Sequence, residues 1–500
     1  MLALATLACS SADDSALDVA LIGTPEEVLT SGLRLSGPAQ QVRSATQSGL
    51  VTLNANGEVV PDLAEAWTVL DDGRSFIFRL RQGLTWPDGQ EMTAASVERA
   101  LREAIAGLEG TSLAQDLALI EEVRAMAGRV IEIRLSAPVP YLVQLVAQPE
   151  LAIRQPGGAT GPMMLTSPGE EGGDRGARAG SEGVGDTHTL AFRPPEERGL
   201  PEDPDWQEEV RPLNIRLVEA RDAIAMFDAG EVEVVMGGRL GSYPLIDLGP
   251  LSTGTLRVET PIGLFGLQVR AEEGLLSNSG VREGLAMALD RDALLEPLGI
   301  TGWTTTTRPV APGLPGEPGL VGERWADADI ADLRAEAAGR IAAWRRQFDS
   351  GDLSRPAPVT IAMPEGGGWQ QLFTGLSQQY RAVGIELRLA DDARSADLVL
   401  IDRIARYASP LWFLNQFHCS LERGLCAEEV DRLVAEAIVQ DDAALRGRAL
   451  AQAEALLTIE NVYIPIANPL RWSLVRGNVD GFALNAYGYH ALPDLARRPR

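Results

Sequence analysis

The stretch that decides the fold is residues 59–89, VVPDLAEAWTVLDDGRSFIFRLRQGLTWPDG. Large apolar side chains alternate along Phe76–Leu80, with the period of two that is typical of a half-buried strand. Asp-Gly dipeptides at 72–73 and 88–89 bracket this strand, and Asp-Gly favours tight turns. The stretch therefore predicts a hairpin or meander.

Helical and strand patterns alternate outward from this stretch. An amphipathic helix is expected from Thr93, since Val97, Leu101 and Ile105 fall on one stripe. Residues 130–135 alternate again as a strand. Such alternation predicts an α/β architecture.

Three further segments carry expectations. Residues 281–295 predict one helix, with Arg282, Glu283 and Arg291 facing largely outward, and residues 428–458 predict another helical region. Residues 167–187 are rich in Gly, Glu and Ser, which predicts a flexible surface loop. Residues 309–322 contain four prolines and four glycines, too many for a regular helix or strand.

Composition limits the class of protein. The chain has 500 residues, a prior of about three domains, and no run of 18 apolar residues that would span a bilayer. Its 70 acidic residues outnumber 44 basic ones, all of them arginine, for a net charge of -26. That charge repels phosphate backbones, so we expect no nucleic-acid partner.

Motifs for catalysis and metal binding are scarce. Only His188, His418 and His490 are present, and the chain shows no His-Glu-x-x-His pair, Walker-type loop or strand-linked Gly-x-Gly-x-x-Gly. No metal-ligand cluster accompanies the histidines, so no metal or other cofactor is expected. The residues alone leave open an enzyme that uses two carboxylates.

The three cysteines suggest an exported protein. Cys9 follows a short apolar start and precedes a polar run, which resembles a bacterial lipoprotein signal whose cysteine becomes lipidated; a cytosolic start with a chance cysteine is the alternative. Cys419 and Cys426 have six residues between them, which fits neither a redox pair nor a usual zinc site. We expect a structural disulfide there.

A resemblance now becomes specific. In order along residues 45–492, the chain resembles the extracytoplasmic solute-binding proteins of ABC importers, family 5, which includes oligopeptide, dipeptide and nickel-binding members. The block at 59–94 is most similar to the family's signature region. Shorter pieces follow in the family's order at 161–162, 229–233, 281–291, 384–385 and 431–433.

The resemblance implies the two-lobed periplasmic-binding-protein fold (type II, cluster C), an α/β fold with an extra subdomain and a hinge. The implied segments are 1–17 for signal, lipobox and tether; 18–50, 150–250 and 466–500 for lobe I; 51–149 for an appended subdomain of lobe I; and 251–465 for lobe II. The ligand would be enclosed as the lobes close.

One departure from the family bears on the ligand. Peptide-binding members carry an aspartate that pairs with the peptide's α-ammonium, and the matching segment here, 405–415, has Arg406 in that place. A guanidinium repels an ammonium and favours a carboxylate or phosphate. Either the ligand lacks a free amine or presents an anion at this point, or Arg406 turns away and pairs with Asp402.

Other candidate ligand-binding residues are Gln47, Trp303, Tyr407, Trp412 and Asn415. Gln47 precedes the family's Ser-Gly-Leu, and Trp303 follows the helix at 281–295. Tyr407, Trp412 and Asn415 flank Arg406, where an aromatic ring would stack on a ligand or pack in the core.

The resemblance implies a periplasmic, monomeric protein without catalysis, lipid-anchored if Cys9 is modified. It would capture a peptide-like or anionic small solute and deliver it to ABC permease subunits in the inner membrane. The alternative is an orphan ligand sensor or chaperone-like peptide binder without a transporter.

Overall fold

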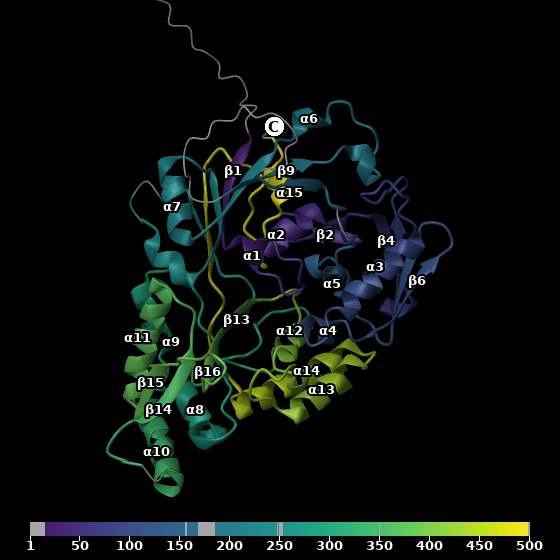
Figure 1. The fold of residues 1–500 in the computed structure, drawn as a ribbon. Coiled ribbons are helices and arrows are strands. Elements are labelled where there is room, and N and C mark those ends of the chain that lie inside the picture. Colours follow the sequence, from purple (N-terminus) through teal and green to yellow (C-terminus); the bar gives the residue numbers. More distant parts are fainter. Residues whose placement is uncertain are drawn as a thin grey trace, which may run out of the picture.

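A computed structural model describes residues 16–155, 158–168, 186–247, 249, 254–349 and 351–498. Two large sheets and a smaller antiparallel unit form the frame (Figure 1). Within the described residues, no helix is long and apolar enough to cross a membrane. Cys9 and most of the expected loop at 167–187 lie outside the described residues.

The first sheet has β1 near its centre. Leu17–Ile22 (β1) pairs in parallel with β10 and β11, and Leu17, Val19 and Leu21 are at most 1% exposed, as is usual for a parallel strand covered on both faces. In spatial order the sheet contains β12 (Leu256–Glu259), β18 (Arg471–Val475), β11 (Val234–Gly238), β1, β10 (Leu213–Val218), β9 (Thr187–Phe192) and β8 (Met163–Thr166).

The second sheet lies at the other end of the molecule (Figure 1). Its order is β15 (Ile385–Leu389), β14 (Ala357–Ala362), β16 (Leu398–Ile404), β13 (Gly263–Val269) and β17 (Tyr463–Ala467). β13 is buried along its whole length and pairs antiparallel with β16 and β17.

Two short connections join the sheets. The chain leaves β12 and enters β13 through residues 260–262, and it returns from β17 to β18 through residues 468–470. β12 belongs to the first sheet because it pairs with β18, a strand from the far end of the chain.

The antiparallel unit follows the predicted meander. Its strands are ordered β4 (Ala64–Leu70), β5 (Ser75–Leu80), β7 (Val130–Leu135) and β6 (Ile120–Met126), and β2 (Val51–Leu53) pairs with β3 (Val59–Pro61) nearby. Phe76, Phe78 and Leu80 are buried, which confirms the predicted strand. α3 (Ala94–Ala106) begins after Thr93, whose Oγ1 accepts from the Ser96 amide at 3.2 Å.

The helix predicted at 281–295 is wrong in two respects. It is two helices, α8 (Ser279–Ala288) and α9 (Arg291–Leu295), because Asp290 caps α9. Arg282 and Arg291 are buried, at 4% and 8% exposed. Each donates to backbone carbonyls, Arg282 to Glu460 and Arg291 to Pro465, so the burial leaves no donor stranded in an apolar environment.

The remaining helices include a pair that packs together near the end of the chain. α13 (Glu428–Ile438) and α14 (Ala443–Glu460) confirm the helical region predicted near 428–458. The others are α1 (Pro25–Val28), α2 (Gly37–Thr46), α4 (Ser112–Asp116), α5 (Leu142–Val146), α6 (Trp206–Glu209), α7 (Ala220–Ala229), α10 (Ile330–Phe348), α11 (Gly367–Arg381), α12 (Pro410–Asn415) and α15 (Leu492–Leu495).

Residues 309–322 form neither helix nor strand, as predicted. A buried ion-pair network holds the start of this segment. Arg308 donates to Glu454 at 2.9 and 3.0 Å and to Glu317 at 3.1 Å, and all three side chains are at most 6% exposed. The loop is therefore tied to α14 by charge rather than by secondary structure.

We expect Arg308→Ala to lower the free energy of unfolding by about 3–5 kcal/mol, because it leaves Glu454 buried without its counter-ion. Urea denaturation would measure the loss. Arg432→Ala on α13 is the matched control: its side chain is 50% exposed, so we expect less than about 1 kcal/mol. Equal losses would contradict a stabilising role for the buried network.

Candidate ligand-binding site

A cavity of about 420 Å³ lies between the two sheets and the antiparallel unit. Residues from all three parts line it, namely 33–38, 40–41, 53, 108, 111–113, 116, 148–150, 237–239, 402–406, 412, 416, 423, 471–473 and 487–490. Concave sites between domains are where small ligands usually bind. A solute in this cavity would contact residues of both sheets at once.

Arg406 lines the cavity and has a partner that the sequence did not suggest. It lies two residues after the end of β16, and its Nη2 donates to Glu150 Oε1 at 2.5 Å. Asp402 pairs instead with Arg471, at 2.8 and 3.0 Å. The alternative in which Arg406 turns away to Asp402 is therefore wrong, because Asp402 is already occupied by a residue from β18.

Glu150 is the main residue that the sequence analysis missed. Its side chain is 3% exposed, it lines the cavity, and its Oε2 has no hydrogen-bond partner among the described residues. A buried carboxylate oxygen without a donor is costly, so it is a natural acceptor for a ligand N–H or O–H. No local motif marks Glu150, which is brought to Arg406 only by folding.

Tyr407 and Asn415 do not line the cavity; they hold a residue that does. Tyr407 Oη donates to Asp116 Oδ1 at 2.8 Å, and Asn415 Nδ2 donates to the same oxygen at 2.7 Å. Tyr141 stacks on Tyr407 with ring centroids 4.3 Å apart. Burial raises the pKa of Asp116 to about 7 despite these hydrogen bonds.

The other predicted residues have different positions. Trp412 lines the cavity and packs edge-on against Phe413, with centroids 4.9 Å apart. Gln47 lies outside the cavity lining and donates to the Gly158 carbonyl at 3.2 Å. Trp303 also lies outside it, and its Nε1 donates to the carbonyl of Asn468 at 2.7 Å. Trp303 thus braces a connection between the sheets.

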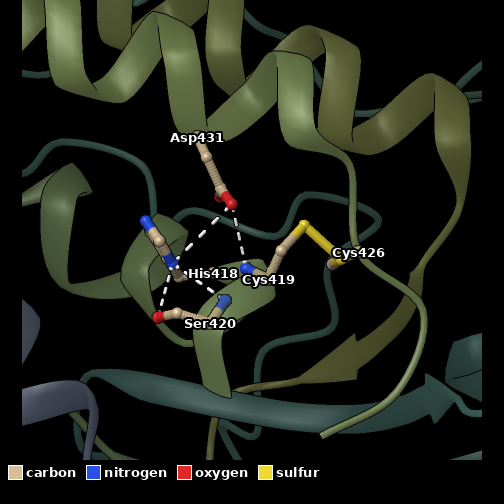
Figure 2. The surroundings of a disulfide bond; sticks show 5 residues. All are labelled: His418, Cys419, Ser420, Cys426 and Asp431. Atoms are coloured by element: carbon tan, nitrogen blue, oxygen red, sulfur yellow. Dashed lines mark hydrogen bonds and ion pairs between the residues drawn. A yellow bond between two sulfur atoms is a disulfide. The ribbon is translucent and has the colours of Figure 1, made fainter. Parts of the chain in front are cut away.

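A disulfide closes the loop that carries Arg423, another residue lining the cavity. Figure 2 shows Cys419 joined to Cys426 below α13. The Cys419 amide donates to Asp431 Oδ2 at 2.9 Å, and His418 Nδ1 accepts from the Ser420 amide at 3.2 Å. The bond from Cys419 to Asp431 joins the cross-linked loop to α13. Among the described residues, no group of three His, Cys, Asp or Glu side chains could hold a metal ion.

Comparisons with known proteins agree with this geometry. Residues 58–420 match the family described as "Bacterial extracellular solute-binding proteins, family 5 Middle". The dipeptide-binding protein DppE of Bacillus subtilis is 21% identical over 475 residues, 88% of this chain and 84% of DppE. The probable deoxycholate-binding periplasmic protein YgiS of Escherichia coli is 33% identical over 120 residues, only 21% of this chain and 22% of YgiS.

The fold has a solved counterpart. The structure of Haemophilus influenzae OppA in complex with the peptide RPPGFSPFR superposes with a TM-score of 0.80 and 18% identity, covering 97% of this chain and 99% of that one. The molecule is thus a two-lobed periplasmic binding protein by fold. With the match over 58–420, the chain belongs to family 5 of the bacterial extracellular solute-binding proteins.

The buried Asp116 predicts a pH dependence of stability. Its folded pKa of about 7 exceeds the ordinary value of 3.8, so between these values the folded state holds a proton that the unfolded state has released. Wild-type stability should therefore fall relative to Asp116→Asn as pH rises from about 4 to about 7, and level off above that. Chemical denaturation of ligand-free protein across this range would measure it.

Asp88→Asn is the control of opposite sign, because a hydrogen bond from the Gln90 amide lowers the pKa of the exposed Asp88. Its stability should fall relative to wild type as pH rises through the acidic range. A pH-independent difference between wild type and Asp116→Asn would show that Asp116 does not stay protonated in the folded protein.

The Arg406–Glu150 pair predicts strong coupling. Arg406→Gln leaves Glu150 buried without its cation and should cost about 2 kcal/mol of stability, whereas Arg406→Gln with Glu150→Gln should recover most of that loss. A double-mutant cycle by urea denaturation measures the coupling. Additive losses would argue against the pair.

Proposed function

We propose that this protein is the substrate-binding component of an ABC importer. It captures a small peptide-like or anionic solute between its lobes and delivers it to a membrane permease, with no catalysis of its own. The cavity lined from both sheets is the observation that carries this proposal. Membership of the family and the likeness to DppE, a dipeptide-binding protein, support it.

Closure of the lobes would follow from the position of the cavity. A solute contacts residues of both sheets only when the lobes are shut, so binding stabilises the closed form. The described state has cross-cleft contacts of this kind: Gln115 of α4 donates to Ser420 at 3.0 Å, and one buried apolar cluster contains Leu113 and Leu117 together with Trp412 and Phe413. Figure 1 shows α4 beside α12.

Arg406 and Glu150 would act on the ligand together. The pair leaves Glu150 Oε2 without a donor, so a ligand amine, amide or hydroxyl group would donate to it. The other N–H groups of Arg406 would donate to an acidic group of the ligand. Trp412 would cover an apolar part of the solute from the same wall. In this arrangement Glu150, from a distant segment of the chain, supplies the carboxylate that peptide-binding members carry at the position of Arg406.

Export is part of the proposal. Cys9, with its short apolar leader, would carry a lipid that holds a monomeric protein at the outer face of the inner membrane. The predicted disulfide between Cys419 and Cys426, which the structure contains, is consistent with an oxidising compartment.

Mass spectrometry of small molecules released by denaturation from protein exported to a periplasm tests the function. We expect bound solutes from the wild type and far less from Ser112→Trp, which places a large ring in the cavity lining. Ser395→Trp, on an exposed turn, is the control and should retain the solutes. Identical solutes from wild type and Ser112→Trp would refute binding in this cavity.

A further inference from the structure

The cavity wall is rich in arginine although the protein is strongly acidic. Six arginines line the cavity, against three acidic residues, while the whole chain has a net charge of -26. The six are Arg34, Arg239, Arg403, Arg406, Arg423 and Arg471, and the three are Asp116, Glu150 and Asp402. The charge of the cavity is thus opposite to that of the molecule.

The acids leave most of this positive charge uncompensated. Glu150 is paired with Arg406, and Asp402 with Arg471. Asp116 accepts from neutral groups. Among the described residues, the other four arginines have no carboxylate within ion-pair distance. Arg403 has only a long hydrogen bond to Gln416, at 3.5 Å.

Three of these arginines line the one cavity from segments far apart in the sequence. Arg34 precedes α2 on the first lobe, whereas Arg403 is on β16 and Arg423 is in the disulfide-closed loop. Burial lowers the pKa of Arg423, and the charge of Arg34 lowers it further. Burial, followed by the charge of Arg423, lowers the pKa of Arg403 to about 10. Like charges are therefore held together without a counter-ion.

Arg239 is the fourth cavity arginine that has no ion-pair partner among the described residues. It follows β11 and lines the cavity. Partial desolvation and then the charge of Arg471 lower its pKa, and the charges of Asp402 and Glu27 oppose this shift. The start of α2 adds to the same field, because Ser36, Gly37 and Pro38 line the cavity and the N-terminus of a helix is the positive end of its dipole.

We infer that the solute is an anion with at least two acidic groups, one bound by Arg34, Arg403 and Arg423 and another by Arg239. This rests on the proposed function and names its substrate class. The acidic groups are carboxylates or phosphates, which guanidinium groups bind alike. An anion between Arg34 and Arg423 also replaces repulsion across the cleft with attraction to both lobes, so the same contact favours closure.

Calorimetric titration with N-acetylated tripeptides tests the inference. The probes are Ac-Ala-Ala-Ala, Ac-Ala-Glu-Ala and Ac-Glu-Ala-Glu, which carry increasing numbers of carboxylates, and Ac-Ala-phosphoSer-Ala, which separates phosphate from carboxylate. We expect at least about tenfold tighter binding for probes with a second acidic group, and a smaller advantage at high salt. Equal affinity for the single-acid probe would overturn the inference.

Variants locate the effect. The multi-acid probes are expected to bind more tightly than Ac-Ala-Ala-Ala. Arg34→Gln and Arg423→Gln should each reduce this ratio of affinities about tenfold. Arg34 makes no side-chain hydrogen bond or ion pair in the described structure, so its replacement should not disturb folding. Arg355→Gln is the control, since that side chain is 83% exposed and is not part of the cavity lining, and it should leave the affinity difference between the probes unchanged. An unchanged advantage in both cavity variants would also overturn the inference.

The released solutes distinguish the two failures. If wild type releases solutes that Ser112→Trp lacks and these are neutral, cationic or singly acidic, the function stands and the inference fails. If Ser112→Trp and wild type release the same solutes, the proposed function fails. Should no tripeptide bind, the number of acidic groups on the released solutes decides: two or more support the inference.

Discussion

The placement of the two sheets relative to each other depends on two short connections between them. Residues 260–262 and 468–470 carry the chain from one sheet to the other. The indole N–H of Trp303 donates to the carbonyl of Asn468, in the second of these connections. Because these covalent links are short, they hold the two sheets close together. The cavity lies between the sheets, and its lining comes from segments that are distant in sequence.

Arginine has three roles in this lysine-free chain. Arg282 and Arg291 are buried and satisfied by backbone carbonyls. Arg308 is buried and satisfied by two carboxylates. Four of the six cavity arginines, Arg423 among them, have neither kind of partner in the described structure. The first two roles stabilise the fold, whereas the third leaves a positive field that only a bound anion would neutralise.

The sequence analysis succeeded where local pattern was sufficient. Alternation along Phe76–Leu80 and the stripe after Thr93 identified real elements, and the family resemblance led to the correct fold. It placed Arg282 and Arg291 outward because a charged side chain on an amphipathic helix is usually solvated. Their carbonyl partners come from segments far along the chain, so no helical pattern could reveal them.

The site shows the same division. The sequence by itself determined the family and the two-lobed fold, and it singled out Arg406 and Trp412, because short motifs and their order survive as local patterns. Only the tertiary structure decided that Arg406 meets Glu150, that Tyr407 and Asn415 serve Asp116, and that arginines from both lobes share one cavity. Those contacts join residues hundreds of positions apart, and packing and charge pairing across the cleft, rather than local preference, bring them together.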